Sequence, residues 1–360
     1  MFLFYNKKMR DLSLNYTAIG SLPFSDKNAP SRALDYVFEH FAEIPFWPQL
    51  PHFARNEDMV LQFSGALPGL EFDGEKYFFD TETERFALEL EELYLDYETV
   101  LGGGEVPDKY KPNSCTIDEF LVRLKVAETP KYVKGSITGP FTMCTSLTDK
   151  DGKCAFYDEL LKDAIVKTIT LSALWQVKKF GNIGATSIIF MDEPSISQLG
   201  SSAFLTVEDE TVTSAISEIA GAIKQFGGLA GIHCCGKTNW EVPAAADLNI
   251  INFDAFSFSQ NLSTQADKIA EFLGGGGILA FGIVPTLDVE ALRASDVASL
   301  EEKFEESLEF LTNKGIKKEQ LLAQCFITPS CGCGSLSETE AIKALEYTKK
   351  LSKKLKGKYS

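Results

Sequence analysis

Two short cysteine-containing motifs of this chain have the residue types and spacing to hold a metal ion. The first is His233-Cys234-Cys235-Gly236, and the second is Cys331-Gly332-Cys333. Residues two apart on an extended strand point the same way, so His233 and Cys235 can bind one ion, to which Cys331 adds a third ligand. One imidazole and two thiolates suit tetrahedral zinc, whose fourth position stays open in catalytic sites. The motifs therefore predict a catalytic zinc site.

The zinc prediction leaves a fourth ligand to be assigned and has to be weighed against other interpretations of the same residues. Asp254 is our candidate for an oxygen ligand at the fourth position. Taken singly, a cysteine is often a small buried hydrophobe and a lone histidine is often only hydrogen-bonded. A redox pair of Cys331 and Cys333, or an iron–sulfur site, is a further alternative. The presence of His-x-Cys and Cys-Gly-Cys at two separate strand ends favours the metal site.

Candidate substrate-binding groups occur at two other strand ends. Asp192 closes the apolar run 188–191 and is predicted to hold a substrate ammonium group, with a helix-capping role as the alternative. Ile19, Gly20 and Ser21 offer backbone N–H groups and a hydroxyl for a substrate carboxylate, although an ordinary turn explains them equally well. The predicted catalytic residues are Asp192, His233, Cys235 and Cys331.

Short β-prone runs that alternate with amphipathic helical segments must position these residues. The runs after residue 131 are mostly apolar without period-two alternation, as expected of parallel strands covered on both faces. The runs are 16–21, 45–50, 132–137, 187–192, 229–233, 250–256, 278–284 and 324–329. Helices are predicted at 156–180, 211–226, 263–273 and 299–314, where apolar residues recur at three and four.

This alternation predicts an α/β fold, a single (β/α)8 TIM barrel over residues 1–360, with a doubly wound open sheet as the competing architecture. We expect residues 71–111 to form an excursion outside the regular alternation. Active sites of such barrels lie at the carboxyl ends of the strands, so residues far apart in sequence converge there. The barrel would therefore bring the candidate residues together.

Composition limits the partners of the protein. The formal net charge of -16 over 360 residues excludes general binding to nucleic acid or to anionic membranes, which requires an excess of Lys and Arg. No stretch approaches the roughly 18 apolar residues of a membrane span, and residues 1–8 are wrongly ordered for a secretion signal. We therefore expect a cytoplasmic protein, whose reduced cysteines can serve a metal.

Several motifs resemble those of the catalytic domain of cobalamin-independent methionine synthase. They are Thr17-Ala18-Ile19-Gly20-Ser21, Thr138-Gly139-Pro140-Phe141-Thr142-Met143, Met191-Asp192-Glu193-Pro194, His233-x-Cys235-Gly236 and Pro329-Ser330-Cys331-Gly332. The zinc motifs are the most specific part of the resemblance. They are shared with methylcobamide:coenzyme M methyltransferases and absent from the related uroporphyrinogen decarboxylases.

The resemblance implies roles for individual residues. His233, Cys235 and Cys331 would bind zinc, Asp192 would hold the homocysteine amino group, and Ser21 would hold its carboxylate. Asp254 falls where the family has a ligating Glu, with a side chain one methylene shorter. A second Glu that anchors the amino group in the family is missing from residues 52–55.

Two departures from the family concern the methyl donor. Cys144-Thr145-Ser146 replaces a Trp of the folate users, and residues 281–285 lack the family's His, an acid for the departing folate nitrogen. A methyl-corrinoid departs as stable cobalt(I) and needs no acid. The departures therefore predict methylcobalamin, or a methylated corrinoid protein, as the donor.

The sequence thus predicts a zinc-dependent methyltransferase whose metal lowers the pKa of a small thiol, foremost homocysteine, so that the thiolate attacks the methyl carbon. The alternatives are a methylcobamide:coenzyme M-type methyltransferase, a metal-free uroporphyrinogen decarboxylase-like enzyme, and a zinc- or corrinoid-binding carrier that is not an enzyme.

Overall fold

The computed structural model describes residues 12–359 of the chain, so the prediction about residues 1–8 lies outside the described residues. Its main feature is a seven-stranded sheet in the order β1-β9-β8-β7-β6-β5-β4, in which every neighbouring pair is parallel. The strands are β1 (Asn15–Tyr16), β4 (Tyr132–Thr138), β5 (Thr186–Asp192), β6 (Leu229–Cys234), β7 (Ile250–Phe253), β8 (Ile278–Val284) and β9 (Cys325–Pro329).

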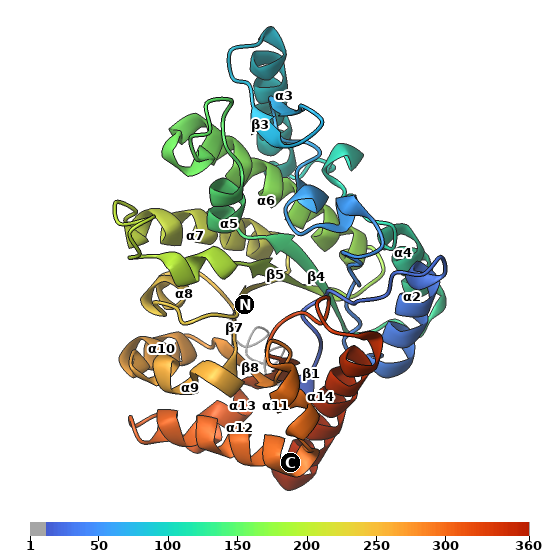
Figure 1. Cartoon of the computed structure of the whole chain (residues 1–360), viewed down its shortest axis with the longest axis vertical. Helices are drawn as coiled ribbons and strands as arrows, with labels where there is room; N and C mark the ends of the chain where they lie inside the picture. The colour runs from blue at the N-terminus through green and yellow to red at the C-terminus, as the bar shows by residue number, and fades with distance from the viewer. Residues whose placement is uncertain (1–11, 360) are drawn as a thin grey trace.

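Helices surround this curled sheet and follow one another around it in chain order, from α2 through α6 and α9 to α14 (Figure 1). They are α2 (Ala29–His40), α3 (Glu84–Leu101), α4 (Ile117–Val126), α5 (Pro140–Ser146), α6 (Glu159–Gly181), α7 (Asp209–Gln225), α8 (Glu241–Ala245), α9 (Ala255–Ser263), α10 (Ala266–Gly274), α11 (Val289–Ala294), α12 (Val297–Thr312), α13 (Lys318–Ala323) and α14 (Glu338–Tyr359). None of these described helices is long and apolar enough to cross a membrane.

The sheet confirms the predicted α/β class, but a full barrel of eight strands is not confirmed. Residues 45–50, predicted as a strand, form only isolated bridges, one between Phe46 and Lys134 of β4 and one between Gln49 and Ser21 beyond β1. Prolines within and beside this segment lack the N–H that a regular ladder requires. The segment therefore bridges β4 and the turn that follows β1 without becoming a strand itself.

Two other boundaries differ from those predicted. The strand predicted at 250–256 ends at Phe253, because Asp254 begins α9 as its N-cap. Residues 70–79 form a separate antiparallel hairpin of β2 (Leu70–Phe72) and β3 (Tyr77–Phe79), which precedes α3. This hairpin and α3 project from the rest of the molecule at the top of Figure 1.

Alternation along the strands decides which side chains face the interior of the curled sheet. Ile188 and Phe190 of β5 belong to a cluster inside the sheet, whereas Ile189 and Met191 pack against the surrounding helices. Successive side chains of a strand point to opposite faces, so Asp192 continues the inward series. The same count from the inward residues Leu229, Ile250 and Tyr132 places His233, Asn252 and Lys134 inside.

Candidate functional site

The carboxyl ends of β6 and β9, which lie on the same side of the curled sheet, bring together three side chains that could hold a metal ion. His233 lies near the end of β6, Cys235 directly follows it, and Cys331 follows β9. One ligand atom from each lies within 4.8 Å of the other two. In the described part of the chain, no other group of at least three His, Cys, Asp or Glu side chains meets this criterion.

The side-chain amide of Asn252 orients the His233 ring. Oδ1 of Asn252 lies 2.5 Å from Nδ1 of His233, and Nδ2 of Asn252 donates to the Ala280 carbonyl and to the Thr328 hydroxyl. Because Nδ2 has two acceptors, the oxygen faces His233 and accepts the Nδ1 proton. Nε2 then carries a lone pair, and it is buried without a hydrogen-bond partner among the described residues. A metal ion satisfies such an atom.

The loop after β9 is fixed by two hydroxyl groups. Ser330 accepts a hydrogen bond of 3.0 Å from the Thr286 N–H, and the Thr286 hydroxyl accepts one of 3.0 Å from the Cys331 N–H. The Cys331 side chain is thereby held toward Cys235 by backbone contacts that do not involve the sulfur. This rigidity suits a preformed metal site.

The electrostatics of the cysteine pair also fit a metal. The facing Cys331 thiol and the adjacent His233 lower the pKa of Cys235 to about 4, despite its burial. The same contact with Cys235, together with burial, raises the pKa of Cys331 well above its usual range. Two facing sulfurs share one proton, which a divalent cation can displace. One imidazole and two thiolates are ligand types that zinc prefers.

The neighbouring cysteines have other surroundings. Cys234 and Cys333 are each 1% exposed and belong to the hydrophobic core, outside the group of metal-binding atoms. Asp254 also lies outside that group, and its carboxylate accepts a hydrogen bond of 2.9 Å from the Ser257 N–H at the start of α9. Burial raises the pKa of Asp254 to about 6. Its observed role is that of a helix cap.

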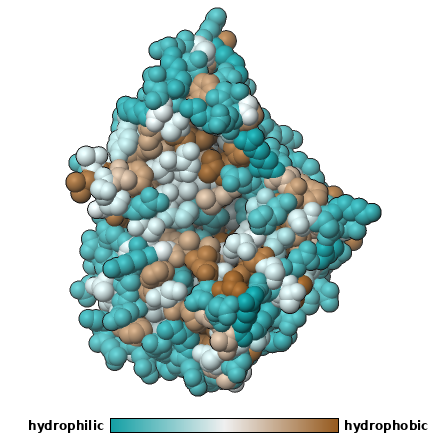
Figure 2. Space-filling model, in the orientation of Figure 1, coloured by the Kyte–Doolittle hydropathy of each residue, from teal (hydrophilic) through white to brown (hydrophobic). Residues whose placement is uncertain are grey.

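His233, Cys235 and Cys331 line a cavity of about 410 Å³. It is lined by Ile19, Ser21, Gln49, Pro51, His52, Glu57, Asp58, Met59, Asp192, Pro194, His233, Cys235, Leu287, Cys331, Gly332, Gly334 and Ser335. Of the predicted site residues, Gly20 and Asp254 do not line it. The face of the molecule seen in Figure 2 is hydrophilic over most of its periphery, and apolar residues gather around a central hollow.

Asp192 presents an unpaired carboxylate oxygen at this cavity. Its Oδ1 is buried without a hydrogen-bond partner among the described residues, and burial raises its pKa to about 6, against the opposing effects of Lys134 and His233. Burial of an unpaired acceptor is costly, so a ligand that donates a hydrogen bond here is favoured. A substrate ammonium group has that property.

The residue that caps a helix at this strand end is Glu193, not Asp192. Glu193 is fully buried and accepts hydrogen bonds from the Phe141 N–H at 2.7 Å and the Thr142 N–H at 2.9 Å, at the start of α5. Consecutive strand residues face opposite sides, so Glu193 serves the helix and Asp192 remains free for the cavity.

The turn at residues 19–21 joins the cavity to the loop that carries Cys331. The Ser21 hydroxyl accepts a hydrogen bond of 3.2 Å from the Gly334 N–H, and the Ser21 carbonyl accepts one of 3.0 Å from the Cys333 N–H. Gly20 has a φ of 152°, and a Cβ there would lie 2.6 Å from Oε1 of Gln49. Only glycine fits this position.

Glu57 is a cavity-lining acid that the sequence motifs did not single out. Its buried carboxylate accepts hydrogen bonds from the Leu50 N–H at 3.0 Å, the Cys115 N–H at 2.5 Å and Nε2 of Gln62 at 2.9 Å. Because its carboxylate oxygens are used by these three donors, Glu57 holds the surrounding loops together. The amino-group anchor missing from residues 52–55 is therefore not replaced by a free carboxylate at Glu57.

Asn252 and Lys134 also escaped the sequence motifs. Asn252 is the single polar residue of β7, whereas Lys134 shares β4 with Ser136 and Thr138. The available signal was that each occupies an inward-facing position of its strand, as His233 and Asp192 do. The partner of Asn252 becomes visible only when β6 and β7 are placed in register, and that of Lys134 only when the curled sheet brings the 19–21 turn next to β4.

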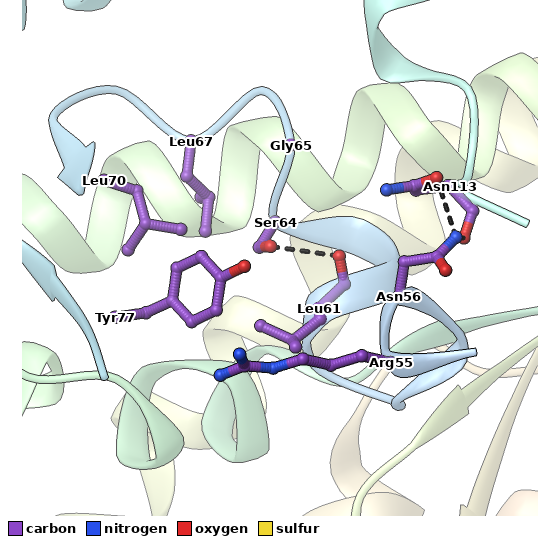
Figure 3. A pocket seen from close by; sticks show the side chains of 9 residues that line it. All are labelled: Arg55, Asn56, Leu61, Ser64, Gly65, Leu67, Leu70, Tyr77 and Asn113. Carbon is purple, nitrogen blue, oxygen red and sulfur yellow. Dashed lines mark hydrogen bonds between the residues drawn. The ribbon is translucent and has the colours of Figure 1, made fainter. Parts of the chain in front are cut away.

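A second cavity, of about 440 Å³, shares no lining residue with the first, and Figure 3 shows the residues that line it. It is lined by Arg55, Asn56, Leu61, Ser64, Gly65, Leu67, Leu70, Tyr77 and Asn113. The Arg55 guanidinium lies 5.7 Å from the centre of the Tyr77 ring, and Asn56 donates a hydrogen bond of 2.9 Å to Asn113. No predicted site residue lines this cavity.

Two solved structures share the fold. A B12-independent methionine synthase from Shewanella sp. W3-18-1, in complex with selenomethionine, matches with a TM-score of 0.55 and 12% identity over 95% of this chain and 98% of that chain. A putative vitamin-B12-independent methionine synthase from Listeria monocytogenes gives 0.53 and 14%, over 94% and 96%. Curated proteins give no match.

The family comparison corrects the predicted methyl donor. The model of the family described as "Cobalamin-independent synthase, Catalytic domain" matches residues 78–354. The prediction of methylcobalamin, or of a corrinoid protein partner, is therefore wrong. It rested on absences at residues 144–146 and 281–285, and none of these residues lines the cavity. The chain belongs to the family of cobalamin-independent methionine synthase catalytic domains.

Proposed function

We propose that this protein is a zinc-dependent methyltransferase that methylates the thiol of homocysteine. The observation that carries the proposal is that His233, Cys235 and Cys331, with ligand atoms within 4.8 Å of one another, line the same cavity as Asp192 and Ser21. A metal-binding group beside acceptors and donors for an amino acid fits a substrate that carries both a thiol and an α-amino acid group.

Each part of the acceptor has a corresponding group in the cavity. The unpaired Oδ1 of Asp192 would accept hydrogen bonds from the ammonium group, and the 19–21 turn would bind the carboxylate. The thiol would then lie beside Cys235 and Cys331. Zinc at His233, Cys235 and Cys331 would supply a Lewis acid that lowers the pKa of the acceptor thiol.

The transfer is a substitution at the methyl carbon. The acceptor thiol loses its proton to solvent, a sulfur–carbon bond forms, and the bond between the methyl group and the donor breaks with its electron pair leaving on the donor. The protein's residues orient the sulfur for in-line attack, which is a large part of the catalytic effect in bimolecular reactions. Family membership favours a donor that is not a corrinoid.

The test is a transfer assay with zinc-loaded protein, homocysteine and methyltetrahydrofolate, with methionine as the measured product. We expect product from the zinc-loaded protein and none after the metal is removed by a chelator, with activity restored by zinc. Methionine formation by the metal-free protein would contradict the zinc requirement. Transfer from methylcobalamin but not from the folate would contradict the choice of donor.

A further inference from the structure

A buried lysine lies next to the turn at residues 19–21. Lys134 is 1% exposed on the inner face of β4, and its Nζ donates hydrogen bonds to the Ile19 carbonyl and, at 2.9 Å, to the Ser136 hydroxyl. The Phe190 ring centre is 4.7 Å from Nζ. Among residues 12–359, Lys134 has no carboxylate within ion-pair distance. A buried ammonium without a counter-ion is costly to fold.

The charge of Lys134 is retained at neutral pH in spite of its burial. Burial lowers its pKa to about 8, and the effect is opposed by the negative charge of Asp192 farther along the neighbouring strand. A core that needed only packing at this position would accept Met or Leu, which fill a similar volume without desolvating a charge. The position therefore requires an explanation beyond packing.

The contact with the Ile19 carbonyl sets the direction of the next peptide N–H. Across a planar trans peptide, the carbonyl of residue 19 and the N–H of residue 20 point in opposite directions. With the carbonyl turned toward Lys134, the Gly20 N–H is turned away from it. In the described part of the chain, the N–H groups of Gly20 and Ser21 donate no hydrogen bond, and Ile19 and Ser21 line the cavity.

We propose that Lys134 is a positioning and selectivity residue that makes the 19–21 turn a site for the carboxylate of the acceptor thiol. It holds the turn through the Ile19 carbonyl, and it adds a positive charge behind the turn where the surrounding dielectric is low. The ligand class is thus a thiol that carries a carboxylate. This inference rests on the proposed function and deepens it.

The test compares two thiols that differ only in the carboxylate. Homocysteine and its decarboxylated analogue, aminopropanethiol, are titrated by calorimetry into the zinc-loaded wild type and the Lys134→Met variant. We expect Lys134→Met to weaken homocysteine binding roughly tenfold or more, as for the loss of a hydrogen bond to a charged group. Its affinity for the analogue should equal that of the wild type.

Two further variants separate charge from structure. Lys134→Gln retains a hydrogen-bond donor without the charge, so its affinity for homocysteine should lie between those of the wild type and Lys134→Met. Ser136→Ala removes the other acceptor of Nζ and should bind both thiols as the wild type does. Zinc content and thermal unfolding of each variant show that the fold and metal site persist.

The outcomes are distinct. The selectivity role is overturned if Lys134→Met and Lys134→Gln weaken the binding of both thiols equally, or if they weaken the binding of neither. A wild-type protein that binds homocysteine no better than the analogue overturns the assignment of the carboxylate to the turn. A zinc-loaded wild type that binds neither thiol overturns the proposed function, and this inference with it.

Discussion

Oδ1 of Asn252 lies 2.5 Å from Nδ1 of His233, and the two residues are paired in register on neighbouring strands β6 and β7. Because the Asn252 amide nitrogen is committed to Ala280 and Thr328, the oxygen can only accept from His233. The ring is thereby fixed in the tautomer that presents the Nε2 lone pair beside Cys235 and Cys331.

Replacing Asn252 should therefore weaken the metal site without touching a ligand. We expect Asn252→Ala to lower zinc affinity about tenfold to a hundredfold, the usual effect of losing a residue that orients a ligating histidine. Asn252→Asp retains an acceptor oxygen and should keep most of the affinity. Competition with a chromophoric chelator measures both, and an unchanged affinity in a correctly folded Asn252→Ala variant would contradict the orienting role.

The four clustered cysteines should divide into two pairs. Cys235→Ala and Cys331→Ala should lose stoichiometric zinc and methyl transfer together, because each removes a thiolate from the group of ligand atoms. Cys234→Ala and Cys333→Ala are matched controls, since both side chains are buried in the core away from the site. They should retain zinc with only a modest loss of unfolding free energy. Metal analysis after gel filtration checks the division, which zinc retention by Cys331→Ala would contradict.

Binding of the acceptor should depend on pH through Asp192, whose pKa is raised to about 6 by burial. Above this pH the carboxylate is charged and attracts the substrate ammonium group; below it the proton neutralises Asp192 and the attraction is lost. Affinity for homocysteine should thus fall roughly tenfold for each pH unit below about 6. The analogue mercaptobutanoate, which lacks the amino group, reports the pH dependence of the thiol alone. Identical pH profiles for the two compounds would remove Asp192 from amino-group binding.

Asp254 provides a test of the fourth zinc position. Its carboxylate caps α9, so Asp254→Ala should cost about 1 kcal/mol of unfolding free energy, and Asp254→Asn should cost less because it still accepts the Ser257 N–H. We expect zinc affinity to remain near that of the wild type in both variants. Chemical denaturation and chelator competition measure the two effects, and loss of zinc from Asp254→Asn would make Asp254 a ligand.

The sequence by itself determined the strand and helix alternation of the central and C-terminal parts, and it singled out the three side chains that the structure brings together as a group that could hold a metal ion. Residue periodicity decides which segments bury both faces, and the His-x-Cys spacing follows from the geometry of a single strand. Local patterns of this kind need no knowledge of distant contacts. The motif at His233 and Cys235 was therefore readable, and so was Cys331 at another strand end.

Tertiary structure decided what depends on neighbours in space. The proline-punctuated segment 45–50 forms bridges to β4 and to Ser21 without becoming a strand, which no local pattern specifies. Asn252 is a lone polar residue until strand register places it against His233. Asp254 carries a carboxylate of the kind that can bind zinc, and only the structure shows that this carboxylate also caps α9 by accepting the Ser257 N–H. Lys134 and the Ile19 carbonyl meet across 115 residues of chain, because only the curling of the sheet brings them together.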